Sequence, residues 1–150
     1  MYGGSPLVPT EKLYQIIDEQ DIILEDFPLI KAPAISLFEA GHYCIGLSPE
    51  LAYHEPQFRV ALAHETGHCM TNSFHNPYSN LNCVGKQEYK ANHWAVYQLL
   101  PWDELSAFLT QGDVEIWQIA EAFSVTCPFV ERALEIYQQD GLYQPPTSMV

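Results

Sequence analysis

Basic residues are few in this chain. Six lysines and arginines stand against nineteen acidic residues, which gives the 150 residues a net charge of −13. A field of this sign repels DNA, RNA and anionic membrane surfaces, and it attracts basic proteins. No apolar run approaches the roughly 20 residues that a membrane-spanning helix needs. The sequence therefore argues against nucleic acid and membrane as partners.

Cysteine is also scarce, and its four residues are scattered. Cys44, Cys69, Cys83 and Cys127 form no CxxC pair, which suits reduced thiols better than a disulfide framework or a thiolate zinc site. The N-terminus lacks a basic start and an apolar core before a small-residue cleavage site. We therefore expect no secretion signal and a cytoplasmic protein.

Apolar residues, in contrast, are plentiful. Hydrophobic residues make up 47% of the chain and aromatic residues 13%, which is enough for a buried core. A length of 150 residues is that of one ordinary domain. We expect a single domain over residues 1–150, with residues 1–9 and 143–150 as flexible tails.

The spacing of the apolar residues predicts an α+β fold. Apolar alternation over residues 35–47, on either side of Ala40-Gly41, predicts a β-hairpin. Residues 71–85 are rich in Asn, Ser, Pro and Gly and predict a loop. Helical periodicity predicts helices on both sides of these segments, the first of them capped by Thr10. The predicted helices cover residues 11–20, 50–70, 86–100, 102–111, 113–125 and 127–137.

The run ALAHETGHCM, residues 61–70, carries a pattern typical of a metal site. His64 and His68 stand one above the other on a helix, at a rise of about 6 Å, so their imidazoles can converge on one ion. Glu65 lies about 100° further round, where it can act as general base toward a water molecule. Gly67 suggests that another element packs closely there. The pattern also occurs on helices without a metal, so a third ligand must support it.

Glu88 is the best candidate for that third ligand. The loop after His68 is long enough to let the next helix fold back across the first. His75, Cys83 and His93 compete with it: the first lies in the loop, the second tends to close a structural site, and the third is off the helix face of Glu88. A surface carboxylate is the alternative for Glu88.

Several stretches together resemble the ImmA/IrrE family of bacterial zinc metallopeptidases, which are found in prophages and mobile elements. They are HETGHC, SFHNPYSNL, EYKANHWAVYQLLPWDEL and VEIWQIAEAFSVTCPFVERAL, within roughly residues 40 to 137. The resemblance places one Zn²⁺ on His64, His68 and Glu88 and the general base on Glu65. It implies a gluzincin-like, zincin-like core with an active-site helix and a glutamate helix beside a small sheet.

Other residues around this core can also be assigned. Asn92 shares the helix face of Glu88, so we expect its side-chain oxygen to accept the free ring N–H of His64. Gluzincins commonly place an aspartate there, and a capping or solvent-facing asparagine is the alternative. The hairpin residues Tyr43 to Leu47 are candidates for an edge to which an extended substrate adds. The oxyanion donor stays open among His75, His93, Tyr78 and Tyr89.

The resemblance implies a zinc endopeptidase that cleaves a cytosolic protein, a helix-turn-helix transcriptional repressor of a prophage or mobile element. The negative charge favours such a basic partner. One alternative is a catalytically silent, zinc-containing anti-repressor or adaptor that acts by binding.

Another alternative is a DNA-binding regulator, because the segment IAEAFSVTCPFVERAL has helix-turn-helix spacing. Between Gln111 and Asp140, however, Arg132 is the one basic residue against six acidic ones. A helix that enters DNA must meet phosphates with positive charge. This segment is better explained as a packing unit or a protein-docking surface.

Overall fold

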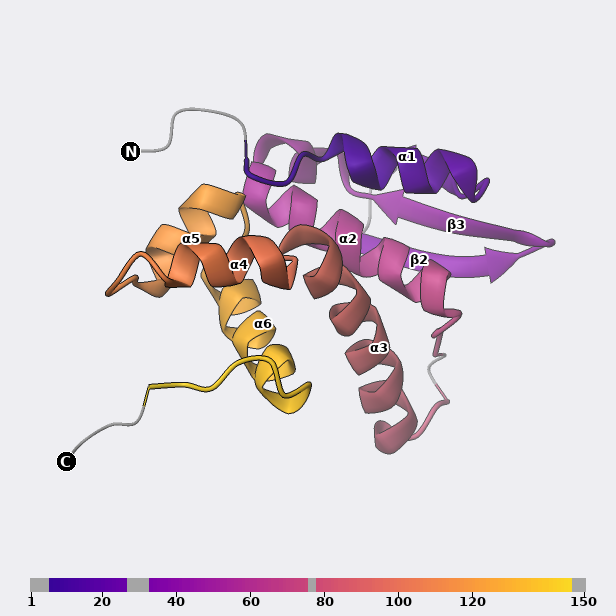
Figure 1. The fold of residues 1–150 in the computed structure, drawn as a ribbon. Coiled ribbons are helices and arrows are strands. Elements are labelled where there is room, and N and C mark those ends of the chain that lie inside the picture. The colour runs from indigo at the N-terminus through magenta and orange to yellow at the C-terminus, as the bar shows by residue number, and fades with distance from the viewer. Residues whose placement is uncertain (1–5, 27–32, 76–77, 147–150) are drawn as a thin grey trace.

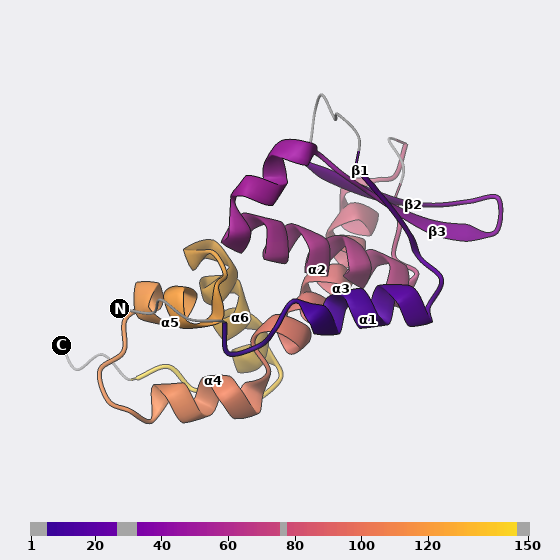
Figure 2. The ribbon, with the colours of Figure 1, turned by 90° about the horizontal axis from the view of Figure 1, so that it is seen from above.

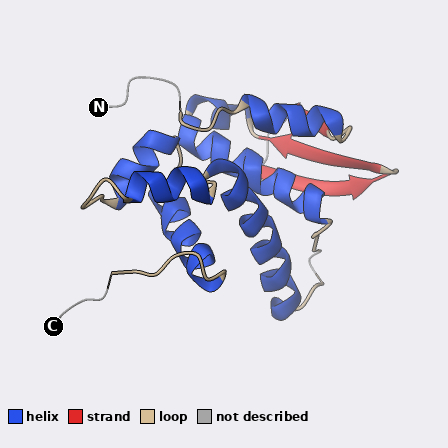
Figure 3. Ribbon diagram, in the orientation of Figure 1, coloured by secondary structure: helices blue, strands red, loops and turns tan. Residues whose placement is uncertain are grey.

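The computed structural model describes residues 6–26, 33–75 and 78–146. Figure 1 shows the sheet at one end of the molecule, α4, α5 and α6 at the other, and α2 and α3 between them. The fold is α+β, as predicted (Figure 3). Its elements are α1 (Glu11–Glu19), β1 (Ile23–Asp26), β2 (Ala34–Glu39), β3 (His42–Leu47), the 3₁₀ helix η1 (Pro49–Tyr53), α2 (Glu55–Thr71), α3 (Leu81–Leu99), α4 (Trp102–Leu109), α5 (Ile116–Phe123) and α6 (Cys127–Gln139).

The sheet has the strand order β1-β3-β2. β2 and β3 form the predicted hairpin, and Ala40 and Gly41 make its two-residue turn with positive φ of 53° and 81°, the conformation that favours such a turn. β1, which the sequence does not predict, pairs with β3 in parallel. Because β3 is the central strand, the expectation that Tyr43 to Leu47 offer a free edge is wrong. Within the described elements, β2 is the strand of the hairpin that lies at an edge of the sheet.

α2 occupies the middle of the fold and packs against α1, β2, β3 and α3 (Figure 2). Its contact with α3 is close because two small residues meet there. A Cβ atom added to Gly67 would lie 2.5 Å from the carbonyl oxygen of Ala91, a distance that no real Cβ contact tolerates. The close approach expected at Gly67 is therefore present, and it brings the two helices into register around the site.

α3 begins earlier than the sequence predicts. The segment 71–85 was expected to be a loop, but Leu81–Gly85 already belong to the helix. The side-chain oxygen of Asn80 accepts the backbone N–H of Cys83 at 2.8 Å, so Asn80 caps the helix. The predicted end of the helix is confirmed, since α3 ends at Leu99, before Pro101.

α5 and α6, the segment with helix-turn-helix spacing, form part of the core. Phe123 and Val130 are fully buried, and Val125 between the helices is 3% exposed. The hydroxyl of buried Tyr137 donates to the carbonyl of Leu100 at 2.7 Å, which ties α6 to the end of α3. These contacts agree with the interpretation of the segment as a packing unit.

Buried Arg59 joins the N-terminal segment to the turn after α5. Its guanidinium donates to the carbonyls of Val8, Phe123 and Ser124, and to the hydroxyl of Thr10 at 2.6 Å. Thr10 therefore binds Arg59 and does not cap α1 through its side chain, contrary to the prediction.

Within the segments expected to be flexible tails, two described residues are packed against the fold. Val8 is 5% exposed, and Tyr143 packs against Trp102 with ring centroids 6.3 Å apart. Residues 1–5 and 147–150 lie outside the described residues.

No helix in the described ranges is long and apolar enough to cross a membrane. The four cysteines are free thiols, as expected.

Candidate metal centre

Three side chains converge between α2 and α3. His64 and His68, one turn apart on α2, direct their Nε2 atoms toward the carboxylate of Glu88 on α3. His64 Nε2 lies 3.2 Å from Glu88 Oε1 and 3.2 Å from His68 Nε2, and His68 Nε2 lies 2.7 Å from Glu88 Oε2. In the described part of the chain, this is the one group of three or more histidine, cysteine and acidic side chains positioned to share a metal ion.

Both histidines are held from behind through their second ring nitrogen. His64 Nδ1 lies 2.8 Å from Asn92 Oδ1, so the contact expected for Asn92 is present. His68 Nδ1 lies 2.5 Å from the carbonyl oxygen of Ser73. An amide oxygen and a carbonyl oxygen accept hydrogen bonds, so each Nδ1 carries the proton and each Nε2 keeps a lone pair for an ion.

The Ser73 carbonyl reaches His68 because of the way α2 ends. Asn72 adopts a left-handed conformation with φ of 50°, and the Ser73 N–H donates to the His68 carbonyl at 3.0 Å. Asparagine tolerates this conformation better than most residues. The turn reverses the chain directly after α2 and returns it to the ring of His68.

The donor set fits Zn²⁺. Two imidazole nitrogens and one carboxylate are a common set for catalytic zinc, which keeps one coordination position free. Ligand atoms that lie about 2 Å from a tetrahedral ion are about 3.3 Å apart. The separations here are 3.2, 3.2 and 2.7 Å, so small shifts would admit the ion.

The surroundings also favour an ionised Glu88. Partial burial raises the pKa of Glu88, but the neighbouring His64, His68 and His75 outweigh it and lower the pKa below its ordinary value. His68 is 5% exposed, while the Glu88 side chain retains 38% exposure. The centre is thus a partly open site with one buried wall, and Glu88 is accessible to solvent.

Glu65 enters the same cleft without joining the ligand cluster. Its Oε1 accepts a hydrogen bond of 2.6 Å from the hydroxyl of Ser36 on β2. The cleft has a volume of about 370 Å³. Its lining combines apolar side chains with the polar groups of the centre: Ala34, Ile35, Ser36, His64, Glu65, His68, Phe74, His75 and Glu88.

The alternatives to Glu88 lie in different places. His75 does reach the site, with Nε2 3.3 Å from Glu88 Oε2. His93 lies elsewhere, with Nε2 2.8 Å from Asp140 Oδ2. Cys83 lies at the start of α3, where its N–H meets the cap of the helix. The structure thus brings Glu88 to the two histidines and leaves His93 and Cys83 outside the ligand group.

The four candidate oxyanion donors separate in the same way. His75 lines the cleft. Tyr89 and His93 pack against each other with ring centroids 5.8 Å apart, and His93 pairs with Asp140 at the far end of α6. Tyr78 is 95% exposed. Of the four, His75 is the one that lines the cleft.

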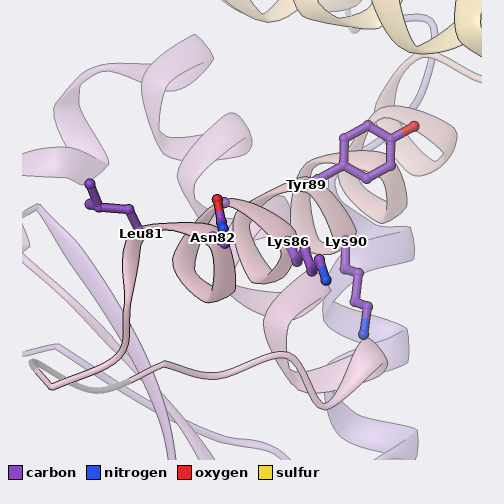
Figure 4. A pocket seen from close by; sticks show the side chains of 6 residues that line it. Leu81, Asn82, Lys86, Tyr89 and Lys90 are labelled. Atoms are coloured by element: carbon purple, nitrogen blue, oxygen red, sulfur yellow. The ribbon is translucent and has the colours of Figure 1, made fainter.

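A second, larger hollow lies on the outer face of α3. It has a volume of about 500 Å³ and is lined by Leu81, Asn82, Gly85, Lys86, Tyr89 and Lys90. Figure 4 shows the side chains of Leu81, Asn82, Lys86, Tyr89 and Lys90 projecting from α3. None of them is a usual ligand of zinc. Size alone would therefore select this hollow, but the group of side chains that could hold a metal ion lies in the cleft between α2, α3 and β2.

Two contacts of the centre lie outside what the motif could indicate. Ser73 makes its shorter contact with His68 Nδ1 through the backbone carbonyl, which any residue type supplies, and a longer one of 3.3 Å through its hydroxyl. Ser36 is one of several serines, and only the packing of the sheet on α2 brings it to Glu65. The signal closest to either contact is Asn72, whose residue type favours the left-handed turn that ends α2.

A protein-family model described as Peptidase_M78, IrrE N-terminal-like domain, matches residues 21–135 of the chain. No curated protein and no solved structure matches it. The matched residues include the sheet, both helices of the centre and most of α6. The chain therefore belongs to the Peptidase_M78 family and contains an IrrE N-terminal-like, zinc metallopeptidase-like domain, in agreement with the resemblance of its motifs to ImmA/IrrE proteins.

Proposed function

We propose that this chain is a zinc-dependent endopeptidase in which His64, His68 and Glu88 hold the ion. The observation that carries this proposal is the placement of Glu65 in the cleft of the three ligand side chains but outside their cluster. A protein that only binds zinc needs no carboxylate there. A hydrolase needs one as general base.

The chemistry divides between the ion and the protein. When bound, Zn²⁺ supplies Lewis-acid polarisation of the scissile carbonyl and makes water easier to deprotonate. Glu65 takes the proton of the attacking water and later gives it to the leaving amine nitrogen. His75 is suited to donate a hydrogen bond to the developing oxyanion, because its ring lines the same cleft.

The substrate segment is proposed to add to β2 as a further strand. The Ser48 N–H donates to the Pro33 carbonyl at 2.8 Å, so this pair is hydrogen-bonded. Because hydrogen-bonded and non-hydrogen-bonded pairs alternate in antiparallel strands, Ala34, Ser36 and Phe38 direct their N–H and C=O groups toward the free edge. An extended peptide can pair there directly beside the cleft.

The proposed substrate is a basic helix-turn-helix repressor encoded by a prophage or mobile element. Family membership and the net charge of −13 support this choice, since attraction between opposite charges speeds encounter. The cut itself requires an extended segment, which a folded repressor must expose. We therefore expect cleavage at one or a few sites, with rates that fall as salt screens the attraction.

The test uses Glu65→Gln. Bacterial cells expressing the parent protein or the variant are compared by identifying new protein N-termini, and any substrate found is incubated with purified zinc-loaded protein. We expect the variant to retain stoichiometric zinc and to lose cleavage, because the amide cannot accept the proton. Elemental analysis and electrophoresis of the substrate give the two measurements.

The same experiment separates cleavage from occlusion. If Glu65→Gln protein inactivates the repressor as well as the parent does, and the repressor stays full-length, binding is the mechanism and the peptidase proposal fails. Cleavage that persists in Glu65→Gln would reject Glu65 as the base.

A further inference from the structure

We propose that Ser36 is the positioning residue for Glu65, and that it links the docking of a substrate strand to the orientation of the general base. This inference rests on the proposed peptidase function. Ser36 belongs to β2, an edge strand of the described sheet, whereas Glu65 belongs to α2. Only the packing of the sheet on α2 brings them together.

The contact is short and directed. Ser36 Oγ donates to Glu65 Oε1 at 2.6 Å, within the range of hydrogen bonds to an ionised carboxylate. Among the residues that the structure describes, no other hydrogen bond to the Glu65 carboxylate is present. A glutamate side chain has several rotatable bonds and loses its orientation unless something holds it. Ser36 holds Oε1 and leaves Oε2 to receive a proton.

Ser36 also has a second role through its backbone. It pairs with Ile45 of β3, and this pair is one of the non-hydrogen-bonded ones that follow from the Pro33–Ser48 bond. Its N–H and C=O therefore face the free edge, while its side chain points to α2. A strand that adds at this edge binds the backbone of the residue whose hydroxyl holds Glu65.

Two Ser36 substitutions separate these roles because neither removes the backbone groups at the edge. Ser36→Val has the size and branching of Ser36→Thr but lacks the hydroxyl. We expect Ser36→Val and Ser36→Ala to lower kcat by about 10-fold to 100-fold. KM should stay within about twofold, and zinc content and thermal stability should not change. Ser36→Thr should restore kcat to near the parent value.

A double-mutant comparison tests whether Ser36 acts through Glu65. Glu65→Asp shortens the side chain by one methylene, so we expect its carboxylate to lose the contact with the Ser36 hydroxyl. In that background we expect Ser36→Ala to have a much smaller effect on kcat than in the parent, because coupled residues give non-additive effects. Ser106→Ala, which removes a hydroxyl from distant α4, is the matched control and should leave kcat and KM unchanged.

The assay uses the protein substrate identified by its Glu65-dependent cleavage. If the parent protein cleaves nothing under these conditions, the proposed function fails and the inference falls with it. If the parent cleaves and Ser36→Ala retains the parent kcat, only the inference is wrong. Equal loss in Ser36→Thr and Ser36→Val, or loss through KM alone, would likewise overturn it, because either result assigns Ser36 a structural or binding role.

Discussion

α3 carries two histidine–carboxylate clusters, and only one of them has the form of a metal site. Near its N-terminal half, Glu88 meets His64 and His68 between α3 and α2. Further along, His93 Nε2 lies 2.8 Å from Asp140 Oδ2, and Tyr97 donates to the same oxygen at 2.5 Å. Each cluster joins α3 to another helix through a carboxylate. They differ in where the remaining donors and acceptors point.

In the first cluster, the Nδ1 atoms of both histidines are hydrogen-bonded to the protein, and their Nε2 atoms point toward Glu88. Asn92 and the Ser73 carbonyl take the Nδ1 atoms, so two Nε2 lone pairs meet one carboxylate. In the second cluster, the imidazole of His93 stacks on Tyr97 with ring centroids 4.5 Å apart. The tyrosine hydroxyl donates a hydrogen bond to Asp140. Contact between a histidine and a carboxylate therefore does not make a metal centre. A metal centre needs several ligand atoms that are held in place and point toward one position.

The strongest test of this comparison removes one histidine or carboxylate from each cluster. We expect His68→Ala and Glu88→Ala to lose zinc, because two remaining ligands do not hold the ion tightly. His93→Ala should keep one equivalent of zinc. Elemental analysis after dialysis measures the metal, and circular dichroism confirms that each variant is folded. If Glu88→Ala binds zinc like the parent, the ligand set is wrong, and His75 becomes the third candidate.

A second test concerns the packing around the first cluster. Gly67→Ala forces a Cβ against the backbone of Ala91, so we expect it to destabilise the protein by about 1–3 kcal/mol and to weaken zinc binding by moving α3. Gly85 lies in α3, and a Cβ atom added there by Gly85→Ala meets nothing within 4 Å. This substitution should stabilise the protein by about 0.5–1 kcal/mol. Urea denaturation of both variants measures the difference, and equal effects would refute the close contact.

A smaller effect is expected from the contact behind His64. Asn92→Ala should weaken zinc affinity by about 10-fold to 100-fold while the domain stays folded. Competition with a chelator measures it. Tyr97→Phe removes a comparable hydrogen bond from the second cluster and should leave zinc affinity unchanged. An unchanged affinity in Asn92→Ala would mean that the contact does not support the metal.

These comparisons also show how far the sequence predicts the site. The HExxH spacing and the helix periodicity predict His64, Glu65 and His68 on one helix, and Glu88 follows from the need for a third ligand and from the family resemblance. The contact of Asn92 follows from its position on the face of Glu88. The structure brings these side chains together. The positions of His64, Glu65 and His68 on one helix follow from local geometry, whereas the choice of Glu88 also needed the family resemblance.

The sequence predicts less where contacts are made across the fold. β1 is four residues long and was missed, and without it β3 could not be recognised as the central strand. Because β1 was not predicted, the edge for substrate binding was wrongly assigned to Tyr43 to Leu47. Arg59 lies within a predicted helix, and nothing in the sequence indicates that its four hydrogen bonds reach Val8, Thr10 and the turn after α5. Such contacts depend on tertiary packing, which local spacing does not encode.

The smallest predicted effect belongs to the second cluster and appears at acid pH. Tyr97 and His93 hold the pKa of Asp140 below its ordinary value by hydrogen bonding, against a weaker opposing effect of burial. A lowered pKa means that the folded state gains stability from the ionised carboxylate above the unfolded pKa of about 3.9, and loses it as the pH falls through the folded value. The cluster is exposed, so we expect less than about 1 kcal/mol.

Asp140→Asn should therefore lower the free energy of unfolding slightly at pH 7, and the difference from the parent should shrink as the pH falls below about 4. Urea denaturation across this range measures it, with zinc affinity at pH 7 as the control. On the alkaline side, burial and Asp140 raise the pKa of Tyr97 to about 12, so the parent should lose stability as the pH rises from about 10 toward that value. A zinc affinity that fell in Asp140→Asn would contradict the separation of the two clusters, because it would couple the exposed cluster to the metal centre through α3.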